Sequence, residues 1–181
     1  MSNRAIIVVD IQNEYFPGGQ LPLEGIEKAV TNAAKVIEHA RSVKDLVVYF
    51  QHESADSEIP FFTPGTQEVA IHPVVAPLDQ ETVLVKHFPN SFRETGLKAL
   101  LDQQNIEEVV IIGAMSHMCI DATSRAASDL GYKTTIVHDA CATLDLEFDG
   151  VMVPATQVHA TIMAALAFAY GTVTATEHYI G

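Results

Sequence analysis

The feature that most constrains the fold is a series of short apolar runs, rich in β-branched residues, that alternate with helical patterns. Each run is apolar at consecutive positions, which predicts strands covered on both faces. Strands of this kind form parallel sheets with helices on both sides. Six runs are predicted as strands: 5–9, 46–50, 83–85, 109–112, 134–137 and 172–175.

Helical segments lie between these runs. Residues 26–40 place apolar side chains at steps of three and four, which predicts one buried helix face. Further helices are predicted around 97–101, from Cys119 to Gly131 with an apolar face at Ala122, Ala126 and Leu130, and over 154–170. The sequence therefore predicts an α/β fold, a three-layer α/β/α sandwich around a mostly parallel sheet of about six strands. One domain is expected over residues 1–181.

Two stretches show no regular pattern. Residues 53–80 contain four prolines, and residues 144–153 contain several turn-forming residues. Loops of this length in a compact domain often act as lids or binding loops. Both stretches are therefore predicted to be irregular and to help determine substrate specificity.

Composition excludes several classes of function. The chain has 10 Lys and Arg against 23 Asp and Glu, a net charge of −13 without any basic cluster, so no nucleic-acid partner is expected. No apolar run reaches the length of a membrane span and no signal peptide precedes the first strand, which predicts a cytoplasmic protein with no membrane association. The hydrophobic share of 48% is high for a small monomer and predicts a homo-oligomer, a dimer or larger.

Three chemically reactive side chains stand at the carboxyl ends of predicted strands, where open α/β sheets bind ligands. Asp10 follows the first strand, Lys86 ends the third, and Cys119 comes shortly after the fourth. Each alone has an ordinary explanation, as a turn residue, a solvated amine or a small buried hydrophobe. An acid, an amine and a thiol at one edge of the sheet together favour a catalytic site.

The segments around these residues resemble the isochorismatase-like cysteine hydrolases, a family that includes nicotinamidases and N-carbamoyl amidohydrolases. The similar segments keep the family's order and spacing over nearly the whole chain: "AIIVVDIQNEYF", "VLVKHFPNSF", "VVIIGAMSHMCIDATSRAASDLGYKTTIVHDACAT" and "VPATQVHATIMAALAFAYGTVTATE". The resemblance implies Cys119 as nucleophile, Asp10 as base and Lys86 as the third member of a triad. It also implies a cis peptide between Ala114 and Met115, and the backbone N–H groups of Met115 and Cys119 as oxyanion donors.

The physical chemistry of the three residues agrees with these roles, with one tension. A helix N-terminus and the Lys86 ammonium would favour the thiolate of Cys119. Reference pKa values of about 3.9 and 8.5 still leave roughly 6 kcal/mol against transfer of the thiol proton to Asp10. Burial would raise the pKa of Asp10 and the nearby cation would lower the pKa of Cys119, and both shifts would reduce this free-energy cost of proton transfer. We therefore expect Lys86 mainly to stabilise and orient the thiolate.

A metal site and other cofactors are not expected. Some relatives, the nicotinamidases, bind a metal through an Asp-x-His motif after the second strand and a further His in the next loop. The corresponding segment "YFQHES" keeps His52 but lacks the Asp, and the loop keeps His72. Two histidines without the carboxylate make a weak site for a divalent ion. His52 is either a donor in the substrate pocket or a satisfied turn residue.

Side chains that flank the three sheet-edge positions are the candidates for a substrate pocket. Their aromatic and thioether content suggests a small, partly apolar substrate. For each of them the alternative is core packing, and Cys141 is expected to be only a small buried residue. The candidates are Gln12, Tyr15, Phe16, His52, Phe61, Phe92, Met115, His117 and Met118.

The sequence thus predicts a cysteine-dependent hydrolase that cleaves an amide or carbamoyl C–N bond of a small molecule through a thioester. Vinyl-ether hydrolysis of the isochorismatase type is one alternative, but that reaction does not need a nucleophilic thiol. A non-catalytic small-molecule-binding protein on the same fold is another. A nucleotide-binding Rossmann protein would need a Gly-rich turn after the first strand, where this chain has "DIQNEYFPGG".

Overall fold

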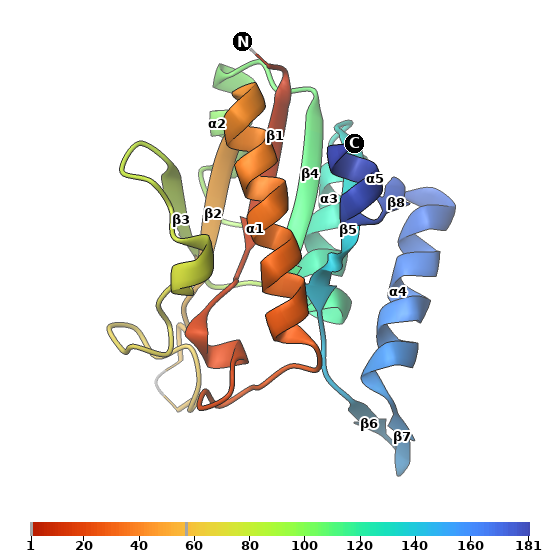
Figure 1. The fold of residues 1–181 in the computed structure, drawn as a ribbon. Coiled ribbons are helices and arrows are strands. Elements are labelled where there is room, and N and C mark those ends of the chain that lie inside the picture. Colours follow the sequence, from red (N-terminus) through yellow and green to blue (C-terminus); the bar gives the residue numbers. More distant parts are fainter. Residues whose placement is uncertain (1, 57) are drawn as a thin grey trace.

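A computed structural model describes residues 2–56 and 58–181, and six of its strands form one sheet with helices on both faces (Figure 1). Their order across the sheet is β3-β2-β1-β4-β5-β8, and each neighbouring pair is parallel. The predicted α/β architecture is therefore confirmed. The strands are β1 Arg4–Val9, β2 Leu46–His52, β3 Thr82–Lys86, β4 Glu108–Ala114, β5 Lys133–Ala142 and β8 Thr172–Thr174.

Helices cover the two faces of the sheet separately. On one face lie α1 (Ile26–Val43) and α5 (Thr176–Ile180); on the other lie α2 (Leu97–Gln103), α3 (Asp121–Asp129) and α4 (Ala155–Ala169). In the central strand β1, Ile6 and Val8 face the α1 layer, whereas Ile7 and Val9 face the opposite layer. Because side chains alternate along a strand, a strand covered on both faces must be apolar at every position.

The segment 144–153 is not irregular, so that prediction was wrong. Strands β6 (Leu146–Phe148) and β7 (Val151–Val153) pair there as an antiparallel hairpin that extends away from the main sheet (Figure 1). The turn residues Asp149 and Gly150 both have positive φ, 51° and 77°. A two-residue type I′ turn needs this conformation, which Asp-Gly adopts easily. The Asp-Gly pair between two short apolar runs was the sequence signal for this hairpin.

The buried face of α3 also differs from the prediction. The helix buries Thr123, Ser124 and Ala127, whereas Leu130 of the predicted face is exposed. A π-helical turn, Ser116–Ile120, precedes α3. The apolar spacing did not show that Thr123 is buried, where its hydroxyl group donates to the hydroxyl oxygen of Ser91 at 2.9 Å.

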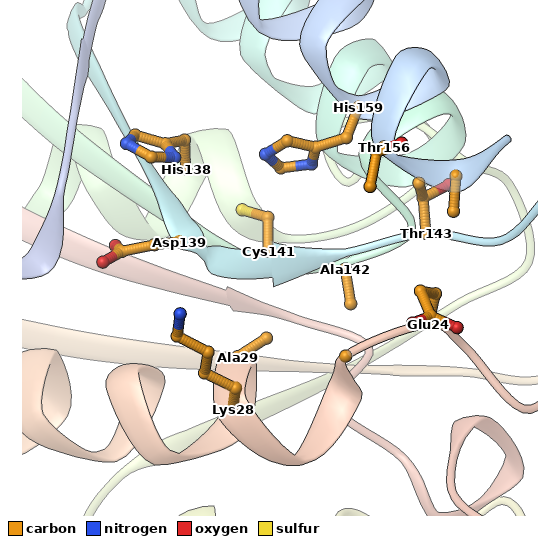
Figure 2. A pocket seen from close by; sticks show the side chains of 12 residues that line it. Glu24, Lys28, Ala29, His138, Asp139, Cys141, Ala142, Thr143, Thr156 and His159 are labelled. Carbon is orange, nitrogen blue, oxygen red and sulfur yellow. The ribbon is translucent and has the colours of Figure 1, made fainter.

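A cavity of about 410 Å³ lies beside β5, between α1 and α4 (Figure 2). Strand β8 pairs only with residues 135–137 of β5, so the rest of that edge of β5 has no strand next to it. His138, Cys141 and His159 are among the residues that line the cavity. The cavity is therefore separate from the carboxyl ends of β1 and β3.

Some apolar side chains are exposed to solvent. Phe148 in the β6–β7 hairpin is 82% exposed, and Phe168 in α4 is 92% exposed. The predicted homo-oligomer stays a prediction. Among the described residues, no helix is long and apolar enough to cross a bilayer.

The close contact between β1 and β4 predicts a strict requirement for Gly113. This residue has φ 125°, and a Cβ there would lie 1.9 Å from the carbonyl oxygen of Val9. We expect Gly113→Ala to lower the free energy of unfolding by at least about 3 kcal/mol, because the clash is with backbone. Gly96→Ala, whose Cβ would meet nothing within 4 Å, should change it by less than about 1 kcal/mol. Urea unfolding measures both, and equal midpoints for the two variants would contradict this explanation.

Candidate active site

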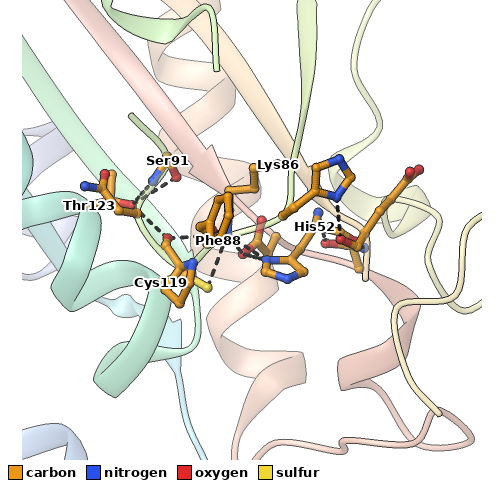
Figure 3. A network of polar contacts seen from close by, with 12 residues as sticks. His52, Lys86, Phe88, Ser91, Cys119 and Thr123 are labelled. Carbon is orange, nitrogen blue, oxygen red and sulfur yellow. Dashed lines mark hydrogen bonds and ion pairs between the residues drawn. The ribbon is translucent and has the colours of Figure 1, made fainter. Parts of the chain in front are cut away.

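The sheet edge brings together the three residues that the sequence singled out. Asp10 follows β1. Lys86, the last residue of β3, lies beside Cys119, which belongs to the turn Ser116–Ile120 after β4 (Figure 3). The ammonium nitrogen Nζ of Lys86 lies 2.7 Å from Oδ2 of Asp10 and 3.2 Å from Sγ of Cys119. The side chains of Lys86 and Asp10 are both completely inaccessible to solvent. The lysine therefore joins the acid to the thiol inside the protein.

Other contacts complete the surroundings of the Lys86 ammonium. Its Nζ lies 3.0 Å from Nδ1 of His52 and 3.0 Å from the carbonyl oxygen of Phe88 (Figure 3). Burial alone would lower the pKa of Lys86, but the Asp10 carboxylate and the Cys119 thiol outweigh that effect and raise it. Lys86 is therefore a charged ammonium in the folded protein.

The thiol of Cys119 keeps its proton in the resting site. Burial is the main cause that raises the pKa of Cys119, and the Asp10 carboxylate raises it further. The Lys86 ammonium acts in the opposite direction but does not overcome these two effects. The prediction of a lowered pKa was therefore wrong. Lys86 is already paired with Asp10, and α3 begins only at Asp121, after the cysteine.

The Asp10 carboxylate retains one oxygen that can accept a proton. Oδ2 pairs with Lys86, whereas Oδ1 is buried and accepts no hydrogen bond from the described residues. A carboxylate oxygen of Asp10 and Sγ of Cys119 lie within 4.8 Å of each other. Asp10 also has φ 50°, a left-handed conformation that is uncommon outside glycine. A strained residue with a buried acceptor beside a thiol is typical of a reactive site.

His52 lies beside the same ammonium but is uncharged. Burial lowers the pKa of His52 to about 4, and Lys86 contributes to this shift although Asp10 opposes it. Because the Lys86 ammonium can only donate, Nδ1 of His52 accepts and the ring proton resides on Nε2. The structure thus places His52 next to the three central residues, and its role as a donor in a substrate pocket stays a prediction.

The candidate metal ligands do not fit a metal ion. In residues 2–56 and 58–181, only Asp10, His52 and Cys119 have ligand atoms close enough together to hold one. The Lys86 ammonium lies within 3.2 Å of an atom of each of them, so a positive charge already occupies the middle of this group. His72 is not part of the group; its ring stacks on Phe16 at a centroid distance of 3.8 Å.

Gln12 interacts with the protein's own backbone instead of facing a pocket. Its side chain is completely buried, and its amide nitrogen donates to the carbonyl oxygens of His52 at 2.9 Å and Val69 at 2.7 Å. Its amide oxygen accepts from the backbone N–H of His52 at 2.8 Å. These contacts use both donor hydrogens, so Gln12 holds β2 and the long loop together and has no hydrogen left for a substrate.

Aromatic side chains from the long loop cover the site near His52. Tyr15 is buried and packs edge-on against Phe62, with ring centroids 5.4 Å apart, and Phe62 also lies 5.0 Å from the His52 ring. Phe61 packs against Phe62 in turn. Sequence reasoning missed Phe62, although it stands next to Phe61 in "PFFT". It also missed Glu14, whose buried carboxylate accepts a hydrogen bond from the backbone N–H of Phe62 at 3.0 Å.

The remaining pocket candidates are held by other contacts. Phe92 stacks on Tyr132 with ring centroids 5.9 Å apart and lines a different cavity, beside α2 and α3. Phe92 also packs against the core cluster that contains Cys119, whereas Phe16 stacks on His72. Met118 is 41% exposed, and Nδ1 of His117 lies 2.6 Å from the hydroxyl oxygen of Thr143.

The turn that carries Cys119 is folded on its own backbone. The peptide bond between Ala114 and Met115 is cis. The carbonyl oxygen of Met115 accepts from the N–H groups of Met118 and Ile120, both at 3.1 Å. These bonds fix the position of the turn at the end of β4. Cys141, the second cysteine, is also buried and free, and burial raises its pKa to about 12.

Comparison with known proteins gives one consistent family. Residues 4–177 match the family model of the isochorismatase domain. An uncharacterized isochorismatase family protein of Bacillus subtilis is 47% identical over 176 residues, which cover 97% of this chain and 98% of that protein.

Two solved structures extend the comparison to the fold. A presumed isochorismatase hydrolase from Oleispira antarctica is 49% identical and superposes with a TM-score of 0.95, over 99% of this chain and 97% of that one. The N-carbamoylsarcosine amidase of Thermoplasma acidophilum is 28% identical with a TM-score of 0.79, over 96% of each chain.

The lowered pKa of His52 predicts a dependence of stability on pH. The unfolded chain binds a proton at His52 below about pH 6.5, whereas the folded protein resists protonation down to about pH 4. The contribution of neutral His52 is therefore complete above pH 6.5 and is lost as the pH falls toward 4. As the pH falls through this range, the parent should lose unfolding free energy because His52 becomes protonated more easily in the unfolded chain. We expect His52→Gln to lose about 1–2 kcal/mol less than the parent, a figure that allows for partial solvent access. Urea unfolding measures this, with exposed His178→Gln as control; identical pH profiles for the parent and His52→Gln would contradict it.

Proposed function

The chain belongs to the isochorismatase family, and from that premise we propose that it hydrolyses a C–N bond, in an amide or carbamoyl group of a small molecule, with Cys119 as nucleophile. The observation that carries the proposal is the Lys86 ammonium held between the Asp10 carboxylate and the Cys119 thiol. A thiol, a buried base and a fixed cation are the groups that acyl transfer to cysteine requires.

The first step forms a bond between Sγ of Cys119 and the carbonyl carbon of the substrate. Because the resting cysteine is a thiol, its proton must leave as the bond forms. The carboxylate of Asp10 lies close to Sγ, and its Oδ1 takes this proton, since that oxygen is buried and has no hydrogen-bond partner among the described residues. Lys86 contacts both the carboxylate and the sulfur, so its charge stabilises the negative charge as it moves from one to the other.

The carbonyl oxygen gains negative charge during this attack. Two backbone N–H groups of the turn, those of Met115 and Cys119, would donate to it. Donors that are already fixed in place stabilise such an oxyanion effectively, because they need little reorganisation. The hydrogen bonds from Met118 and Ile120 to the carbonyl of Met115 supply that rigidity.

The intermediate then breaks its C–N bond. The leaving nitrogen takes the proton from Asp10 and departs as an amine or ammonia, which leaves a thioester on Cys119. A water molecule gives a proton to Asp10 and attacks the thioester carbon, and the departing sulfur recovers that proton. The products are the acid and the free amine, and the enzyme returns to its starting state.

The surroundings support a small, partly apolar substrate. Phe61, Phe62 and Tyr15 provide apolar surface beside His52. The relative named N-carbamoylsarcosine amidase acts on a C–N bond, which favours the same class of reaction here. The expectations of no nucleic-acid partner and of a homo-oligomer remain part of this proposal.

Replacement of the nucleophile tests the proposal. A panel of small amides, ureido acids and carbamoyl compounds is screened for release of ammonia, and the most active compound is used with the variants. We expect Cys119→Ala to reduce kcat by at least about 1,000-fold, because the thioester cannot form. Cys141→Ala should keep activity within about threefold, since that thiol lies outside the group formed by Asp10, Lys86 and Cys119.

Two results would count against this assignment. Undiminished turnover by folded Cys119→Ala would exclude Cys119 as nucleophile. Loss of turnover in Cys141→Ala with retention in Cys119→Ala would move the chemistry to the other thiol. Circular dichroism and thermal melting confirm that both variants remain folded.

A further inference from the structure

A buried serine in the turn before Cys119 has two polar partners outside the catalytic group. Ser116 is completely buried, and its hydroxyl oxygen lies 3.2 Å from the carbonyl oxygen of Ala142 and 2.8 Å from Nδ1 of His159. These partners come from the end of β5 and from α4, respectively. Ser116 therefore connects the turn that carries the nucleophile to β5 and to α4.

The direction of the two hydrogen bonds follows from the chemistry of their atoms. A carbonyl oxygen only accepts, and a hydroxyl group has one hydrogen to donate. If Ser116 donates to Ala142, then Nδ1 of His159 must carry the ring proton and donate to Ser116. In any other arrangement, one of these two buried contacts has no hydrogen between its polar atoms, and an unmade buried hydrogen bond costs free energy. Burial, with a further effect from His138, lowers the pKa of His159, so the ring is neutral and can hold one tautomer.

We propose that His159 is a positioning residue, which through Ser116 holds the turn of residues 115–119 in the geometry that hydrolysis requires. Ser116 lies between Met115 and Cys119, so any displacement of Ser116 moves both proposed oxyanion donors and the sulfur. The adjacent His117 makes a second link to the same end of β5, through Thr143. This inference rests on the proposed function.

His159 does not itself belong to the reacting group. It reaches from α4 over Cys141 into the cavity beside β5, where it faces His138 (Figure 2). His138 lines the same cavity, but the described contacts give its ring no hydrogen bond to Ser116. His138 is therefore the matched control: the same residue type in the same cavity, without the link to the turn.

Kinetics of four variants test the proposal. We expect His159→Ala to lower kcat by about 10–100-fold, as loss of an outer supporting hydrogen bond does elsewhere. KM should stay within about twofold, because substrate contacts are unchanged. His159→Asn should recover most of kcat, because its amide N–H can occupy the place of Nδ1–H, whereas His159→Gln should not. His138→Ala should behave like the parent.

Equal kcat values for His159→Ala and the parent would overturn the proposal, as would equal losses in His159→Asn, His159→Gln and His138→Ala. If the His159→Ala variant does not fold, a measurement on the parent protein without substrate still tests the proposal. Nitrogen-15 NMR of the parent should show His159 protonated at Nδ1 and bare at Nε2, and a signal for the opposite tautomer would overturn the proton chain. If no panel compound is hydrolysed, or Cys119→Ala stays active, the proposed function fails, whereas the NMR result still tests the chain from His159 to Ala142.

Discussion

The buried ion pair between Lys86 and Asp10 is the interaction on which the rest of the site depends. Both charges are removed from water, which costs several kcal/mol for each ion unless close partners compensate. Here Nζ of Lys86 meets the carboxylate at 2.7 Å, and the Phe88 carbonyl and the neutral His52 ring occupy further sides of it. The same ammonium then contacts Sγ of Cys119. The arrangement therefore places the nucleophile beside its base without giving the sulfur a full counter-charge of its own.

The parallel sheet makes this arrangement possible. Asp10 and Lys86 end strands that flank β2, and the register of β2 with β3 pairs His52 with Lys86 directly. Cys119 arrives from the other side of β1, through the turn after β4. At that point β1 and β4 approach so closely that Gly113 has no room for a side chain. Backbone packing thus fixes the separation between the base and the turn of the nucleophile.

Much of this could be predicted from particular residues. Six apolar runs gave the strands, and the residues at their ends gave Asp10, Lys86 and Cys119 without any knowledge of side-chain contacts. The protonation state of Cys119 could not be predicted, because it depends on the balance between burial, Asp10 and Lys86. Gln12 was assigned to the pocket from its place in the chain, but its side-chain amide donates hydrogen bonds to backbone carbonyl groups of residues that lie 40 and 57 positions away in the sequence. Ser116 and His159 are likewise far apart in the sequence. A contact between such distant residues produces no local sequence pattern from which it could be predicted.

The central claim is that the proton remains on Cys119 until a carbonyl group arrives, with Asp10 ready to accept it. Ultraviolet thiolate absorbance of the parent, compared with Cys119→Ser, tests this claim most directly and needs no substrate. Cys141 is present in both proteins and cancels in the comparison. The account predicts no difference between the two proteins from about pH 5 to pH 9, where an unperturbed thiol with a pKa of about 8.5 would already ionise. A thiolate signal from Cys119 that appears at or below about pH 7 would contradict it.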